Sequence, residues 1–147
     1  MNIQLFNKSS NPSPKKQTAG AAGFDLAVSE GYRLKAGSTN MLNTGIHVAI
    51  EEGYEGQIRL RSSLGKKGII ITNSPGTIDS DYRGELKILI YNTNSHTFGI
   101  EKGERIAQLI INKIPEVHIE ELSEEDFFNT VGLHTVRGKG GFGSTGE

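Results

Sequence analysis

The chain has 147 residues, a net charge of −1 and no cysteine, and 35% of its residues are apolar. These values predict one domain with a modest core, and they exclude disulfides, thiolate metal sites and the strongly basic surface of a duplex-DNA binder. No signal-like or membrane-spanning apolar run is visible, which predicts a soluble cytoplasmic protein with no membrane partner and no direct nucleic-acid partner.

Many short apolar stretches, separated by glycine and asparagine, run along most of the chain. The candidate strands in chain order cover residues 3–6, 24–27, 32–34, 41–42, 47–50, 58–60, 69–71, 86–91, 98–100 and 106–111. Apolar and polar residues alternate around 58–60, which predicts a half-exposed strand, whereas the richer apolar content of 86–91 predicts a central strand with two buried faces. Short strands with regular turn signals predict an all-β sandwich or barrel.

Two of these strands carry one polar residue inside an apolar run. Asp25 lies in AGFDLA and Gln108 lies in RIAQLII. A polar group in such a place costs roughly a few kcal/mol unless it is paired. Each residue therefore either has a hydrogen-bond partner or lines a binding site, and the residues alone leave both interpretations open.

The one clear helix signal covers residues 62–67, directly after a strand that ends at Arg61. Ser62 is the expected N-cap, and the free N–H groups at a helix start favour an anion, here with Arg61 beside them. The spacing is not that of a P-loop. The segment by itself indicates a phosphate cradle and no particular nucleotide.

The segment 73–84, NSPGTIDSDYRG, has the composition of a turn-rich hairpin that leads into the 86–91 strand. It carries two carboxylates, Asp79 and Asp81, which can orient a water molecule, bind a cation or cap a turn. Turn formation is the commoner role of Asp and Ser in such a place. The four histidines lie too far apart in the sequence for a zinc helix, so we interpret them as structural or solvated.

After His118 the chain becomes acidic and then rich in glycine. Ser123 and Asp126 have the spacing of a capping box, and RGKGGFGSTGE closes the chain. Such a tail cannot bury enough surface to hold itself in place, because ordering ten residues costs on the order of 10–20 kcal/mol of backbone entropy. It is either a solubilising tail or a flap for a phosphorylated, planar ligand, and its ring, cations and hydroxyls suit the second role.

Five segments, in this order and spacing, resemble the five motifs of the trimeric dUTPase family. They are AGFDLA, RSSLGKKG, NSPGTIDSDYRGE, GERIAQLI and RGKGGFGSTG, and they extend over residues 20–146. The resemblance implies a jelly-roll-like β-barrel of the β-clip type that forms a homotrimer with a swapped C-terminal arm. The implied divisions are a barrel domain at residues 1–119, a connector at 120–136 and a mobile arm at 137–147 that completes the active site.

The activity that the resemblance implies is hydrolysis of dUTP to dUMP and pyrophosphate with Mg²⁺ as cofactor, which keeps uracil out of DNA and supplies dUMP for dTMP synthesis. Asp79 would be the catalytic base that activates a water molecule against the α-phosphorus. Asp25 would hold water molecules of a magnesium ion that the triphosphate chelates. The implied phosphate-binding residues are Arg61, Ser62, Ser63, Gly65 and Gln108.

Base and sugar recognition would fall to the hairpin. Tyr82 would pack beneath the sugar and exclude a 2′-hydroxyl. The residues implied to recognise uracil are Gly76, Thr77, Ile78, Asp79 and Lys87 through the backbone, and Asn73 through its amide. In the arm, Phe142 would stack on uracil, Arg137, Ser144 and Thr145 would bind the γ-phosphate, and Gly143 would also contact the substrate.

Two alternatives accompany this prediction. A dUTPase-like nucleotide-sensing regulatory or binding protein would share the fold, and its nucleotide state would control a partner protein. A dCTP deaminase also shares the fold, but it needs a catalytic glutamate, lacks the RGKGGFGSTG pattern of the arm and releases ammonia from dCTP.

Overall fold

The computed structural model describes residues 2–131, 135 and 140–141. The chain divides into two units, Met1–Pro115 and Glu116–Glu147, and the first unit contains all the strands of the described residues. Within the described part of the chain, no helix is long and apolar enough to cross a bilayer. The boundaries expected at residues 119 and 136 stay predictions.

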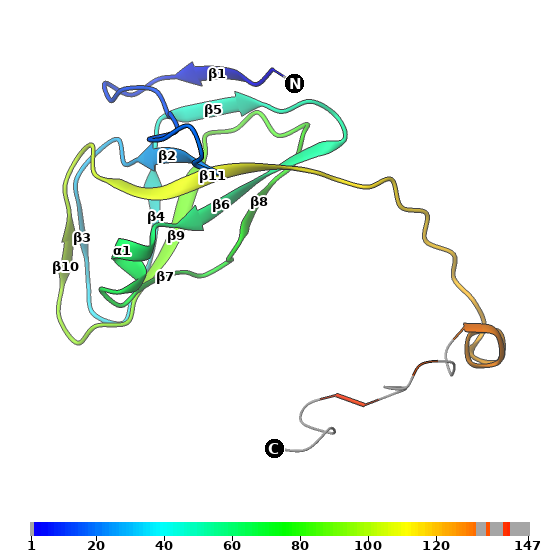
Figure 1. The fold of residues 1–147 in the computed structure, drawn as a ribbon. Helices are drawn as coiled ribbons and strands as arrows, with labels where there is room; N and C mark the ends of the chain where they lie inside the picture. Colours follow the sequence, from blue (N-terminus) through cyan, green and yellow to red (C-terminus); the bar gives the residue numbers. More distant parts are fainter. Residues whose placement is uncertain (1, 132–134, 136–139, 142–147) are drawn as a thin grey trace. The chain divides into compact units, whose positions relative to one another are not determined.

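The first unit is a jelly-roll-like β-barrel in which every strand pairing is antiparallel (Figure 1). The strands are β1 (Gln4–Asn7), β2 (Phe24–Ala27), β3 (Tyr32–Leu34), β4 (Thr39–Asn43), β5 (Ile46–Ala49), β6 (Tyr54–Leu60), β7 (Ile69–Ile71), β8 (Gly76–Ile78), β9 (Lys87–Asn92), β10 (Phe98–Ile100) and β11 (Arg105–Lys113). Helix α1 (Ser62–Gly65) follows β6. All the predicted strands are present, and β8 is an additional strand inside the predicted hairpin.

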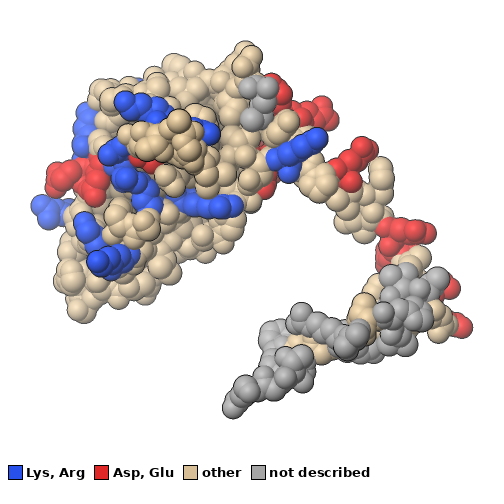
Figure 2. All heavy atoms as spheres, viewed as in Figure 1, with Lys and Arg blue, Asp and Glu red and all other residues tan. Residues whose placement is uncertain are grey.

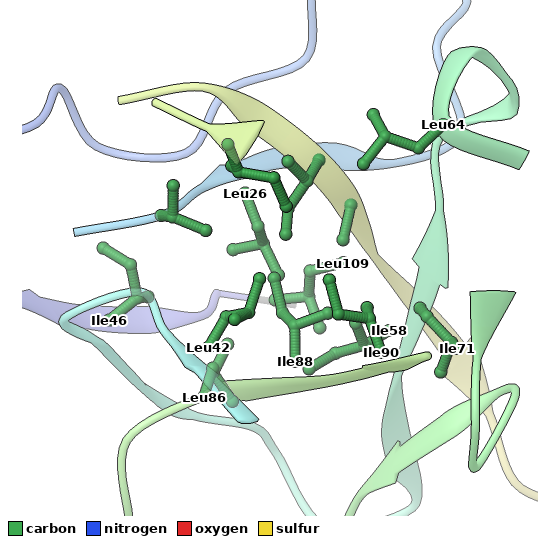
Figure 3. Packing of buried hydrophobic residues seen from close by; sticks show 14 of the residues in the cluster. Leu26, Leu42, Ile46, Ile58, Leu64, Ile71, Leu86, Ile88, Ile90 and Leu109 are labelled. Atoms are coloured by element: carbon green, nitrogen blue, oxygen red, sulfur yellow. The ribbon is translucent and has the colours of Figure 1, made fainter. Parts of the chain in front are cut away.

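Two sheets, β2-β11-β6-β8 and β4-β9-β7, enclose the core, and the pairs β1-β5 and β10-β3 complete the barrel. Side chains from both sheets point toward one another in Figure 3, among them Ile58 and Leu109 from the first and Leu42 and Ile88 from the second. These four are at most 3% exposed. Period-two alternation places such residues on one face of each strand, which is why a chain with few apolar residues still closes a core.

Strand β9 differs from its prediction in one respect. It buries Ile88 and Ile90, but Lys87 on the opposite face is exposed and Leu89 is only half-buried. The strand is central to its sheet, yet among the described residues only one of its faces is buried in the core. The expectation of two buried faces is therefore wrong for the described part of the chain.

Strand β6 lies between β11 and β8 in the first sheet. It pairs with β11 from Tyr54 to Leu60 and with β8 from Gly56 to Ile58. A side chain at Gly56 would come within 3.0 Å of Leu109 and 3.1 Å of Ile78. Glycine at this position therefore lets both neighbouring strands pack closely around β6.

The described part of the second unit contains two short helical segments, α2 (Glu124–Asp126) and η1 (Phe127–Val131). Ser123 is the N-cap of α2, and its side chain accepts a hydrogen bond of 3.1 Å from the backbone N–H of Asp126, as the capping-box spacing predicts. Acidic side chains are prominent along this unit in Figure 2.

Asn92 is the most fully enclosed polar residue of the barrel, with no exposed surface. Its amide donates to the carbonyls of Leu34 at 3.0 Å, of His96 at 2.9 Å and of Lys35 at 3.2 Å. Its side-chain oxygen accepts from the backbone N–H of Asn94 at 3.0 Å. One side chain therefore satisfies backbone groups of three segments at the end of β9.

We expect Asn92→Ala to lower the free energy of unfolding by about 2–3 kcal/mol, because it removes the donor of one buried and two partly buried carbonyl groups. Urea unfolding followed by circular dichroism measures the change. Asn112→Ala, at a half-buried position of β11, is the matched control and should change stability by less than about 1 kcal/mol. An equal loss of unfolding free energy in the two variants would contradict the stabilising role of the Asn92 hydrogen bonds.

Candidate functional site

The residues that the sequence singles out fall into two groups on the barrel. The first group surrounds Asp25, where β2, β11 and the end of β6 meet. The second group surrounds Asp79, on the hairpin that follows β8. Both groups depend on the register of β6, which is followed directly by Arg61 and pairs with β8 from Gly56 to Ile58.

Asp25 is buried and is paired on several sides. It lies opposite Gln108 in the β2–β11 pairing, and Gln108 Nε2 donates to Asp25 Oδ1 at 3.0 Å. Arg105 Nη1 donates to Asp25 Oδ2 at 3.2 Å, and Arg61 Nε lies 3.8 Å from Oδ1. The Asp25 side chain is 1% exposed, whereas those of Arg61 and Arg105 are 32% and 46% exposed. The carboxylate therefore holds two guanidinium groups at the surface.

Arg105 belongs to this group although sequence reasoning gave it no role. Strict alternation puts residues three apart on opposite faces of a strand, which separates Arg105 from Gln108. The β2–β11 register shifts between Arg105 and Ala107, and this irregularity lets both side chains reach Asp25. An irregular register has no reliable signal in the sequence of one strand.

Helix α1 continues from this corner of the barrel. Arg61, and not Ser62, occupies the N-cap position, and the structure shows no side-chain capping bond there, so the predicted N-cap is wrong by one residue. The buried Leu64 anchors the helix, while Ser62 and Ser63 are exposed. The space beside Gly65 is open. Hydroxyl and backbone groups of this turn are therefore accessible to a ligand.

Basic side chains lie around this corner of the barrel. Figure 2 shows Lys and Arg side chains gathered over the part of the first unit where Figure 1 places α1 and β2. Arg61 is fixed there from both ends, because its backbone N–H donates to Ile106 O at 3.0 Å and its Nη1 donates to Arg105 O at 3.1 Å. A fixed guanidinium beside exposed hydroxyls can bind phosphate oxygens.

The second group lines a cleft of about 380 Å³. The lining residues are Met41, Thr77, Ile78, Asp79, Tyr82, Glu85, Lys87 and Leu89. Asp79 is exposed, and among the described residues its carboxylate has no hydrogen bond or ion pair. The turn after it is closed by a bond of 3.2 Å from Tyr82 N–H to Asp79 O. The cleft thus presents a free carboxylate and a phenol ring on one short turn.

Asn73 and Gly76 are adjacent at the start of this hairpin. A side chain built on Gly76 would meet the Asn73 amide at 3.4 Å and Ile58 at 3.5 Å. Gly76 is buried and pairs with Ile58 of β6, so the backbone of β8 is fixed before it reaches the cleft.

Glu85 is the one carboxylate lining this cleft that the sequence did not single out.

The two groups do not meet within one chain. Gly56 pairs with Ile78, next to Asp79, while Arg61 follows the other end of β6. At about 3.3 Å per residue, the strand between Gly56 and Arg61 spans roughly 17 Å. In Figure 1, α1 lies at the arrowhead end of β6.

The resolved pKa shifts lie outside both groups. Hydrogen bonds from Tyr32 and Asn43 lower the pKa of Glu30 below its ordinary value, and burial raises the pKa of Tyr32. Among the described residues, no three His, Cys, Asp or Glu side chains gather in a way that would hold a metal ion. The predicted arm residues Arg137, Phe142, Gly143, Ser144 and Thr145 lie outside the described residues.

Comparisons with known proteins agree with the fold and the motifs. The family model described as dUTPase matches residues 9–146. The deoxyuridine 5'-triphosphate nucleotidohydrolase of Nautilia profundicola is 48% identical over 91% of this chain and 90% of its own, and that of Wolinella succinogenes is 46% identical over 91% and 86%. A Staphylococcus bacteriophage 80alpha dUTPase with dUPNHPP has a TM-score of 0.86 at 27% identity, with 99% of both chains covered.

We expect Asp25→Ala to lower the free energy of unfolding by about 1–3 kcal/mol, because it leaves the Gln108 amide and two guanidinium groups without their shared acceptor. Asp81→Ala, which removes an exposed carboxylate from the hairpin, is the matched control and should have a much smaller effect. Denaturant unfolding of both variants measures the difference, and a similar value for the two would refute the structural role of Asp25.

Proposed function

The chain belongs to the dUTPase family, and from this premise we propose that it hydrolyses dUTP to dUMP and pyrophosphate with Asp79 as the catalytic base. The observation that carries the residue assignment is the exposed Asp79 carboxylate, which stands without a side-chain partner among the described residues at the cleft that also contains Tyr82. The proposed residue roles come from the resemblance of the sequence motifs to those of the dUTPase family, and the geometry of these groups supports them.

A general base needs a carboxylate that can accept a proton from a water molecule and is not held by an ion pair. Asp79 meets this requirement, whereas Asp25 does not, because arginine and glutamine side chains occupy both of its oxygens. We assign to Asp79 the orientation and deprotonation of the water molecule that attacks the α-phosphorus. The pyrophosphate then leaves on the side opposite to the attacking oxygen.

The triphosphate would bind at the Asp25 corner. Arg61 provides a fixed guanidinium, Ser62 and Ser63 provide hydroxyls, and Gly65 offers open backbone. Gln108, held by Asp25, would donate a further hydrogen bond. Positioning and charge neutralisation by such groups account for most of the rate in phosphoryl chemistry.

Magnesium fits this corner as an ion that arrives with the substrate. Mg²⁺ keeps several water ligands and is usually held by substrate phosphates and one or two carboxylates. The described residues contain no cluster that would hold it alone, and Asp25 is the carboxylate that would receive its water ligands. A carboxylate has about four lone-pair sites, so hydrogen bonds from Gln108 and Arg105 leave acceptor capacity. When bound, the ion neutralises phosphate charge and fixes the conformation of the triphosphate.

Uracil would be recognised by the backbone of the hairpin. Gly76, Thr77, Ile78 and Asp79 form or follow β8, and the Asn73 amide lies beside Gly76. Lys87 lies on the returning strand and lines the same cleft. A fixed set of backbone donors and acceptors rejects cytosine, because mismatched groups would be buried without partners.

Several copies of the chain would be needed for one site. The roughly 17 Å of strand from Gly56, which pairs beside Asp79, to Arg61 separates the cleft from the phosphate-binding corner, so the two groups would meet across an interface. Apolar residues stand exposed on the outer face of the β4-β9-β7 sheet, with Met41 at 55% and Ile70 at 48%. Val117 and Ile119 of the second unit are 68% and 93% exposed. These features support the proposal of a homotrimer with a swapped C-terminal arm.

We expect Asp79→Asn to bind dUTP but to lose turnover by roughly 10²–10⁴-fold, the usual contribution of a general base. Asp81→Asn, two residues along the same turn, is the control and should retain activity. Pyrophosphate release from dUTP, UTP, dCTP and dTTP, with and without Mg²⁺, gives the rates, and ammonia release from dCTP would instead reveal a deaminase. Full activity of Asp79→Asn would remove the assignment of the base.

Truncation after Val136 tests the proposed arm. We expect the shortened chain to keep its fold and its oligomeric state but to lose roughly 10²-fold in activity, because substrate positioning would be incomplete. Analytical ultracentrifugation and circular dichroism check assembly and fold, while pyrophosphate release measures activity. Unchanged rates in a folded, truncated protein would exclude the arm from the site.

A further inference from the structure

The chain that returns from the hairpin to β9 is bound along its length to the turn between β4 and β5. The Thr44 hydroxyl donates to Leu86 O at 2.6 Å, in a bond that is fully buried. The backbone N–H of Leu86 donates to Ile46 O at 2.7 Å. These two bonds fix the point at which the hairpin enters the barrel.

Two further contacts extend this attachment toward the cleft. The backbone N–H of Gly45 donates to Glu85 Oε1 at 2.8 Å. The ring of His47 lies with Nδ1 at 3.1 Å from Arg83 O. The side chain of Glu85 thus reaches back from the cleft to the turn, although it lines the same cavity as Asp79.

The turn that receives Glu85 is itself constrained. Gly45 has a φ of +71°, a conformation that favours glycine. A side chain at Gly45 would also come within 2.8 Å of Ser9 Cβ. At the base of the turn, the backbone N–H of Asn43 donates to the Tyr32 hydroxyl at 2.8 Å. The Gly45 N–H is therefore a fixed donor for the Glu85 carboxylate.

Tyr82 is held by the same segment. Its hydroxyl donates to Glu85 O at 3.0 Å. A side chain built on Gly84 would overlap the phenol ring of Tyr82, and no other atoms are nearer to it. Gly84 is not among the glycines of left-handed φ, so the ring and not the backbone conformation requires the absence of a side chain.

We propose that Gly84 and the Glu85 carboxylate are positioning residues that set the place of the Tyr82 ring and thereby the discrimination between deoxyribose and ribose. This inference rests on the proposed hydrolysis of dUTP. An apolar pocket rejects an added hydroxyl by only about 10²-fold, and stronger exclusion needs a wall that cannot retreat. The Tyr82 ring can exclude a hydroxyl in this way only if it is held rigidly. Gly84 holds it by close contact, and Glu85 holds the same segment by its hydrogen bond to Gly45.

The first test replaces Gly84 by alanine in the full chain. We expect Gly84→Ala to lower the ratio of kcat/KM for dUTP to that for UTP by at least about tenfold, because the added methyl group displaces the ring from the sugar. Gly31→Ala is the matched control: Gly31 lacks a positive φ, and an added Cβ there would make only ordinary contacts, at 3.5 Å and beyond. An unchanged ratio in folded Gly84→Ala overturns the proposal.

The second test separates the hydrogen bond of Glu85 from its charge. Glu85→Gln keeps an oxygen that can accept from Gly45 N–H, so we expect it to retain the dUTP-to-UTP ratio, whereas Glu85→Ala should lower it. Equal loss of the ratio in both variants would assign the effect to charge and overturn the positioning role. If Glu85→Ala fails to fold, Tyr82→Phe removes only the bond to Glu85 O and should lower the ratio to a smaller degree.

The ratio distinguishes positioning from a merely structural role, because destabilisation lowers the rates for both nucleotides alike. It also keeps this inference apart from the proposed function. A wild-type protein that releases no pyrophosphate from dUTP refutes the proposed function. A wild-type protein that is active, with variants whose ratio does not move, refutes only the role of Gly84 and Glu85.

Discussion

The antiparallel pairing of β6 with β11 on one side and β8 on the other is the constraint on which the site depends. Through β11 it brings Gln108 and the bulged Arg105 to Asp25, and its last residue leads into Arg61 and α1. Through β8 it fixes the backbone that precedes Asp79. Because successive side chains of a strand point to opposite faces, a slip of one residue would place the wrong side chains in both groups.

The same pairing keeps the two ends apart. A strand is stiff and extended, so groups at opposite ends of β6 cannot be brought together by a change of side-chain rotamer. The chain thus presents the proposed phosphate-binding corner and the proposed base-recognition cleft at separate places. In the proposed trimer, an interface between copies would bring the two together, and the exposed Met41 and Ile70 lie on a sheet face that such an interface could bury.

The cleft owes its shape to contacts that lie outside it. Tyr82 and Asp79 are on a short turn with little burial of its own, and such a turn is held in place only by what it is tied to. Here, hydrogen bonds join Glu85 and Leu86 to the turn at Thr44 and Gly45. In the proposed site, selectivity for the sugar depends on two turns that are distant in sequence and adjacent in the barrel.

The sequence by itself determined the all-β class, the strands and the capping box at Ser123, because these follow from local alternation and short-range hydrogen bonds. It also singled out Asp25 and Gln108 as polar residues that either have partners or line a site. Only the tertiary structure decided that they pair with each other, that Arg105 joins them and that Glu85 reaches Gly45. Those contacts join residues 40 or more positions apart, and strand register and bulges, which no local pattern specifies, create them.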